Sequence, residues 1–184
     1  MAVTNRDLCP GIFLEQIRYL ARLRPAGILL REKELSEADY EKLAKEVLSI
    51  CREEETVCIL HTWPQIAGRI GCPNLHLPLP KLREWAGRLR GFEMLGASVH
   101  SVQEALEARE LGATYVTAGH VFCTDCKKGV PARGLSFLRE VCHAVDIPVY
   151  GIGGINEENY SEVLDQGAAG YCLMSEAMKM ERKG

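Results

Sequence analysis

A long polar stretch from Ala118 to Gly134 holds the residues best suited to chemistry, namely one histidine and two lysines. His120 directly follows an apolar run, and because an imidazole exchanges protons near neutral pH, we predict that it transfers a proton. A structural histidine remains the alternative. One of the two lysines, for which Lys127 is our candidate and Lys128 the other choice, is expected to bind a phosphate or carboxylate.

A glycine pair, Gly153 and Gly154, stands between an apolar run and a predicted helix start. Bare backbone N–H groups in such a turn can converge on an anion near a helix N-terminus. Met174 and Ser175 follow the next apolar run, which in a barrel would bring them to the same edge. We therefore predict a phosphate site at these four residues, with a simple tight turn as the alternative.

Cationic and neutral polar residues follow several other apolar runs. Arg31 and Lys33 flank Glu32 in an extended segment and suit an anionic ligand, unless they form only a surface charge cluster. His61 and Ser98 complete the candidate ligand-binding set. Cys123 and Cys126 invite a zinc or redox interpretation, but no second cysteine or histidine pair lies nearby, so we predict no metal there.

These residues must be positioned by elements that alternate about every 20 to 25 residues between short apolar runs and helical periodicity. The predicted strands are Ala2–Thr4, Gly27–Arg31, Thr56–His61, Asn74–Leu77, Glu93–Ser98, Ala113–Ala118, Pro148–Ile152 and Gly170–Met174. The predicted helices are Gly11–Arg22, Ser36–Arg52, Trp63–Ile70, Leu82–Arg88, Ser101–Leu111, Leu135–Ala144 and Asn156–Gln166, with a short eighth within Glu176–Lys183. This order favours a single (β/α)8 TIM barrel domain over residues 1–184, with a doubly wound open sheet as the alternative.

Composition restricts the partners and the compartment. The net charge of -3 with interspersed signs disfavours binding to nucleic acid or to an anionic membrane. The first residues lack the pattern of a signal peptide, and no apolar run is long enough to span a membrane, so we expect a cytoplasmic protein. The 8 scattered cysteines are expected to be reduced, and no cofactor is predicted.

Several segments resemble, in order, the thiamine phosphate synthase superfamily. They are Leu30–Lys33, Asn74–His76, Ala97–Ser101, the 118–134 loop and Gly151–Gly154. Within that superfamily, Gly119–Phe122 followed by Thr124–Gly129 and Arg133–Gly134 resembles the TenI branch, the thiazole tautomerases. The synthases bind magnesium pyrophosphate through an Asn-Asp pair after strand three and an aspartate after strand four, where this chain has His61-Thr62 and Lys81.

The resemblance implies an isomerase of thiamine biosynthesis that aromatises a carboxythiazole phosphate tautomer. His120 would then move the proton, while the backbone amides of Gly153, Gly154 and Ser175 would bind the phosphate. Arg31, Lys33 or Lys127 would face the carboxylate, and members of the family are often homodimers. Two alternatives remain: a thiamine phosphate synthase with an altered metal site, and a non-catalytic barrel that binds a phosphorylated ligand.

Overall fold

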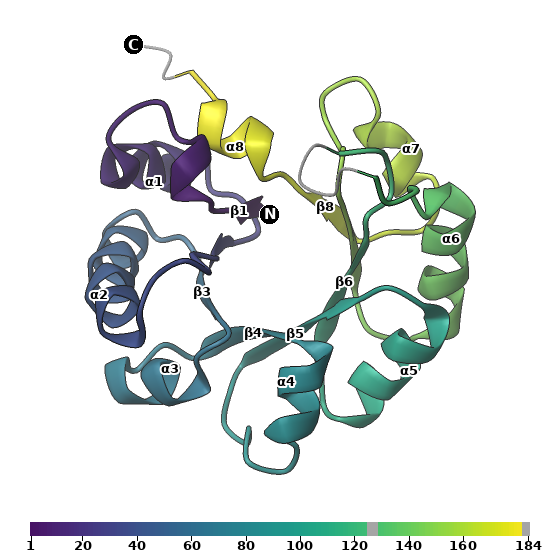
Figure 1. Ribbon diagram of the computed structural model, residues 1–184, viewed down its shortest axis with the longest axis horizontal. Coiled ribbons are helices and arrows are strands. Elements are labelled where there is room, and N and C mark those ends of the chain that lie inside the picture. The colour runs from purple at the N-terminus through teal and green to yellow at the C-terminus, as the bar shows by residue number, and fades with distance from the viewer. Residues whose placement is uncertain (125–128, 182–184) are drawn as a thin grey trace. The chain divides into compact units, whose positions relative to one another are not determined.

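The computed structural model describes residues 1–124 and 129–181. Eight parallel strands alternate with helices, and their order in the sheet follows their order in the chain, as Figure 1 shows by colour. The predicted (β/α)8 fold class is therefore confirmed. By its internal contacts the chain forms two compact units. The first unit comprises Met1–His76 with Met174–Gly184, and the second comprises Leu77–Leu173.

The first unit contains the strands β1 (Ala2–Val3), β2 (Ile28–Leu30), β3 (Cys58–His61) and the start of β4 (Asn74–Pro78). Its helices are η1 (Arg6–Leu8), α1 (Phe13–Arg22), α2 (Glu37–Glu53), α3 (Pro64–Ile70) and α8 (Ser175–Lys179). The strands are buried on both faces, as their continuous apolar sequences predict. Gln16 of α1 joins the two ends of the chain, because its Nε2 donates to the carbonyls of Ala177 at 2.9 Å and Met180 at 3.1 Å.

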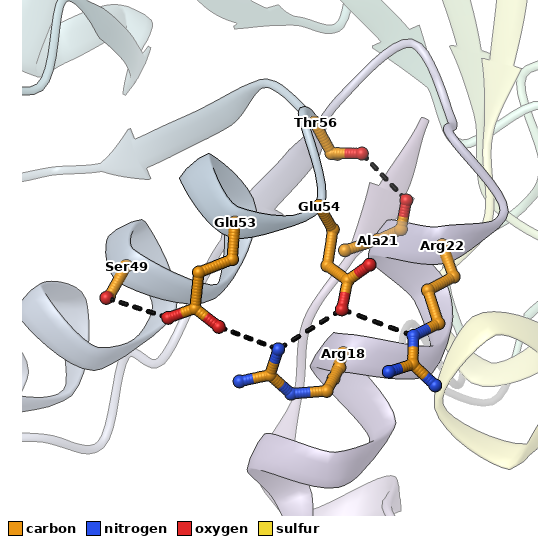
Figure 2. Close-up of polar contacts among 7 residues, drawn as sticks. All are labelled: Arg18, Ala21, Arg22, Ser49, Glu53, Glu54 and Thr56. Carbon is orange, nitrogen blue, oxygen red and sulfur yellow. Dashed lines mark hydrogen bonds and ion pairs between the residues drawn. The ribbon is translucent and has the colours of Figure 1, made fainter.

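Ion pairs link α1 and α2 on the outside of the first unit (Figure 2). Arg18 donates from Nη1 to Glu53 at 2.8 Å and to Glu54 at 3.1 Å, and Arg22 donates to Glu54 at 3.2 Å. Exposed pairs of this kind contribute little each, at most about 1 kcal/mol. The buried apolar stripes of the two helices therefore account for most of the stability of their packing.

The second unit contains β5 (Met94–Val99), β6 (Tyr115–Gly119), β7 (Val149–Ile152) and β8 (Gly170–Cys172). Its helices are α4 (Leu79–Glu84), α5 (Val102–Glu110), α6 (Gly134–Ala144) and α7 (Tyr160–Leu164). Small residues allow the closest packing: a Cβ on Gly151 of β7 would lie 2.7 Å from Val163 Cγ1 of α7. Glycine at 151 thus lets α7 lie directly on the sheet.

Two predicted helices differ from those observed. The helix expected at Leu82–Arg88 begins at Leu79, because Pro80 supplies a favourable first turn, and the chain turns at Gly87 with a φ of 76°. The helix expected at Asn156–Gln166 shortens to Tyr160–Leu164. Its first turn is replaced by side-chain hydrogen bonds of Asn156 and Asn159 to the local backbone.

The expected short eighth helix is observed as α8, whereas η1 was not predicted. All seven cysteines in the described part of the chain are free thiols. No helix within the described ranges combines the length and the apolar character needed to cross a membrane.

Candidate functional site

Arg31 and Lys33 follow the end of β2 and flank Glu32 in the sequence. The Glu32 carboxylate turns toward the start of the chain, where it accepts hydrogen bonds from Thr4 Oγ1 at 2.6 Å and from the Arg6 backbone N–H at 3.0 Å. Thr4 Oγ1 in turn accepts the N–H of Arg31 at 2.9 Å. The backbone of Arg31 is therefore held by Thr4, the residue directly after β1.

His61 ends β3 as a buried residue with 5% of its surface exposed. Its backbone N–H donates to the Tyr40 hydroxyl at 2.8 Å, and that hydroxyl donates to the Leu30 carbonyl at 2.7 Å. Its ring Nδ1 lies 2.5 Å from Thr62 Oγ1. Tyr40, which we did not predict as a site residue, thus joins the ends of β2 and β3 and fixes His61.

Thr62 and His76 complete a compact group with His61, which we call the β3–β4 cluster. Thr62 has a left-handed φ of 73°, a strained conformation for a β-branched residue, and its N–H donates to the His76 carbonyl at 3.0 Å. The rings of His61 and His76 stack with centroids 5.9 Å apart. The cluster is held by backbone as well as side-chain contacts, so its geometry is tightly specified.

Both histidines of the β3–β4 cluster are held in the neutral state. Burial lowers the pKa of His76 to about 3. Burial also lowers the pKa of His61 well below its ordinary value, with smaller contributions from His76, Arg31 and Lys33. Arg31 and Lys33 therefore act electrostatically on the His61 ring and favour its neutral state.

The low pKa of His76 makes stability depend on pH. Below the ordinary pKa of a histidine, the unfolded chain binds a proton at His76 that the native state does not bind. The free energy of unfolding therefore falls with decreasing pH until the native pKa near 3 is reached. Between about pH 7 and about pH 5 we expect His76 to cost about 2 kcal/mol in the free energy of unfolding, measured by urea titration. His61 acts in the same direction.

The variant His76→Gln should lose that part of the pH dependence. The matched variant His143→Gln, at an exposed helical position, should keep it. A His76→Gln protein whose stability varies with pH as steeply as the unmodified protein would contradict the assignment.

Met174 and Ser175 belong to the first unit, at the start of α8. Arg31 Nη1 lies 4.0 Å from Met174 Sδ, so the structure brings these two candidates together. Ser175 is the first residue of α8.

The glycine pair and His120 lie in contact in the second unit. A Cβ on Gly153, whose φ is 99°, would collide with Cα and Cβ of His120, and a Cβ on Gly154 would lie 2.8 Å from Phe122 Cβ. The Gly153 carbonyl accepts from the Phe122 N–H at 3.0 Å, and the Gly154 carbonyl accepts from Asn159 Nδ2 at 2.9 Å. Neither glycine N–H donates to a described residue, so this turn can offer both to an anion.

The glycine turn differs from the prediction in one respect. We expected a helix N-terminus beside the pair, but α7 starts only at Tyr160, and a turn at residues 157–159 precedes it. The anion-binding capacity of this turn therefore rests on its backbone amides rather than on a helix dipole.

His120 has 6% of its surface exposed, and its Nε2 lies 3.2 Å from the Val130 carbonyl. A carbonyl only accepts, so Nε2 carries the proton, and in the neutral ring Nδ1 is an acceptor. His100 donates from Nδ1 to the Gly119 carbonyl at 2.7 Å. Ser98 lies in β5 and accepts from Thr117 Oγ1 at 3.5 Å. Lys127 and Cys126 lie outside the described residues.

The residues at the positions that the resemblance associates with magnesium, namely His61, Thr62 and Lys81, do not fit that ion. Mg²⁺ requires hard oxygen ligands, but His61 offers nitrogen and Thr62 Oγ1 is engaged with it. Lys81 is a cation that pairs with Glu84 at 2.8 Å. Among residues 1–124 and 129–181 no group of three or more histidines, cysteines and carboxylates could hold a metal ion.

Comparison with known proteins points to one family. The family model described as thiamine monophosphate synthase matches residues 1–177. The thiamine-phosphate synthase of Pyrococcus horikoshii is 35% identical over 97% of this chain and 86% of its own length. That of Clostridium acetobutylicum is 35% identical over 84% of this chain and 74% of its own. The structure of thiamine phosphate pyrophosphorylase from Pyrococcus furiosus superposes with a TM-score of 0.84 at 30% identity, covering 98% and 87% of the two chains.

These relatives correct the predicted enzyme class. The isomerase prediction is wrong, because the relatives are named as synthases and pyrophosphorylases, which are transferases. The resemblance to the superfamily is confirmed, but the narrower resemblance to its tautomerase branch is not. The relatives do not test the proton transfer predicted for His120, which remains a prediction.

Proposed function

This chain belongs to the thiamine monophosphate synthase family, and from that premise we propose that it is a transferase joining a pyrimidine pyrophosphate to a thiazole phosphate. The observation that carries the proposal is the similarity to named synthases along almost the whole chain. The products are thiamine phosphate and pyrophosphate.

The reaction requires the protein to bind and orient two anionic substrates, and it does not require a general base. A carbon–oxygen bond to pyrophosphate breaks and a carbon–nitrogen bond forms to the thiazole ring, whose nitrogen supplies a lone pair and has no proton to lose. The leaving pyrophosphate takes the electrons of the broken bond. Cations that neutralise this charge stabilise the transition state. Arg31 and Lys33, with His61 beside them, are proposed to do so in the first unit.

In the second unit we propose that the N–H groups of Gly153 and Gly154 bind the thiazole phosphate. His120 touches this turn and presents Nδ1 as an acceptor, which suits it to orient a ligand. Ser98, Met174, Ser175 and Lys127 complete the proposed binding set. The cytoplasmic location, the homodimer and the single-domain organisation remain predictions.

A second candidate function is ligand binding without turnover. It is favoured by one observation, namely that His61, Thr62 and Lys81 occupy the positions of the synthases' magnesium ligands. Such a protein would bind the phosphorylated compounds and release no product.

One assay separates the two candidates. Purified protein is incubated with both substrates, with and without Mg²⁺, and thiamine phosphate and pyrophosphate are quantified by chromatography. We expect the two products in equal amounts, and none when either substrate is omitted. Binding of thiazole phosphate by calorimetry with no product under any condition would reject the transferase and leave the binding protein.

A further inference from the structure

The region around Arg31 and Lys33 contains cations and a neutral ring, and the carboxylate between the two cations in sequence, Glu32, turns toward the start of the chain. Both oxygens of Glu32 are engaged with Thr4 and Arg6. Arg31 extends as far as Met174 Sδ, and both cations act on the His61 ring. The end of β2 thus presents positive charge toward β3.

The β3–β4 cluster stands at the strand ends where a divalent cation would need oxygen ligands. Two hydrogen bonds lie within the cluster: Thr62 Oγ1 is engaged with His61 Nδ1, and the Thr62 N–H donates to the His76 carbonyl. A Mg²⁺ ion beside this cluster would also be repelled by Arg31 and Lys33, and no group of three or more histidines, cysteines and carboxylates within residues 1–124 and 129–181 could hold it. The same two cations would attract a diphosphate.

We infer that this chain binds the diphosphate end of its ligand through Arg31 and Lys33 without a divalent cation, the β3–β4 cluster taking the place of the metal site. Arginine binds phosphate oxygens in a bidentate manner and lysine acts as a point charge, so together they supply the neutralisation that an ion would otherwise provide. His61 remains neutral and adds no charge of its own. The inference rests on the proposed function and specifies which groups of the protein neutralise the charge of the diphosphate.

Direct binding of inorganic pyrophosphate tests the inference. In calorimetric titrations we expect saturable binding in EDTA, with an affinity at least equal to that measured with Mg²⁺. Arg31→Met and Lys33→Met should each weaken this binding about tenfold or more, as the loss of a charge-assisted hydrogen bond does. Lys42→Met, at an exposed position of α2, is the matched control and should change it by less than about twofold.

A second measurement uses Mn²⁺ alone as a paramagnetic substitute for Mg²⁺. The amplitude of the electron paramagnetic resonance spectrum of free Mn²⁺ should not fall when the protein is added. Saturable Mn²⁺ binding, or pyrophosphate binding that disappears in EDTA, would overturn the inference. So would a Lys42→Met variant as weak as the Arg31 and Lys33 variants, since binding would then reflect overall charge. Circular dichroism confirms that each variant is folded before it is titrated.

The outcomes separate this inference from the proposed function. Pyrophosphate bound in EDTA through Arg31 and Lys33, without any thiamine phosphate formed from the two substrates, would uphold the inference and reject the transferase. Thiamine phosphate formed only with Mg²⁺, together with pyrophosphate binding only with Mg²⁺, would reject the inference and uphold the transferase.

Discussion

Replacing Gly153 by alanine is expected to lower the free energy of unfolding by about 2–5 kcal/mol and to abolish phosphate binding at the glycine turn. Two costs add. The φ of 99° is strained for any residue with a Cβ, and the new Cβ would collide with Cα and Cβ of His120. Urea titration measures the first effect, and calorimetry with thiazole phosphate measures the second.

Gly112→Ala separates strain from collision. Gly112 has a φ of 94°, close to that of Gly153, but a Cβ there meets nothing within 4 Å. This control should therefore show only the backbone cost, about 1–2 kcal/mol, and unchanged ligand binding. Equal losses of stability in the two variants would show that contact with His120 is not tight, and would weaken the case for a preformed turn.

Tyr40→Phe is expected to destabilise the protein by about 2–4 kcal/mol, although it removes a single oxygen atom. The Tyr40 hydroxyl accepts from the His61 N–H and donates to the Leu30 carbonyl, in a residue with 1% of its surface exposed. Its loss leaves a buried donor and a buried acceptor without that partner. Chemical denaturation measures the effect, and weaker pyrophosphate binding should accompany it because His61 loses its support.

Tyr160→Phe is the matched control, since Tyr160 is 40% exposed and should change stability by less than about 0.5 kcal/mol. A Tyr40→Phe protein as stable as this control would mean that the two backbone groups find other partners. Tyr40 would then have no role in positioning His61.

Much of the fold could be predicted because each strand and helix has its own local pattern. All eight strands were placed, since short apolar runs between turns leave few alternatives. The start of α4 was misjudged although its signal was present: proline in the first turn favours a helix there. The shortened α7 was harder to foresee, because Asn156 and Asn159 form their own backbone contacts only once the chain has turned.

The candidate site was predictable where one segment determines its geometry. The glycine turn follows from two adjacent residues that adopt positive φ. The state of His61 could not be read from its neighbours in sequence, because it depends on burial, on the ring of His76 and on the cations of another strand. The enzyme class could not be predicted from the loop at 118–134 and the residues at 61, 62 and 81, because the similarity to named synthases extends over most of the chain.

Gln16 links α1 to α8, and this link affects how the chain folds while it is being translated. The first unit is assembled from both ends of the chain, whereas the second is one continuous segment, Leu77–Leu173. During translation, the first unit is complete only when α8 has been synthesised. The second unit is complete earlier, once Leu173 has been added. The order of translation and the order of completion are therefore reversed.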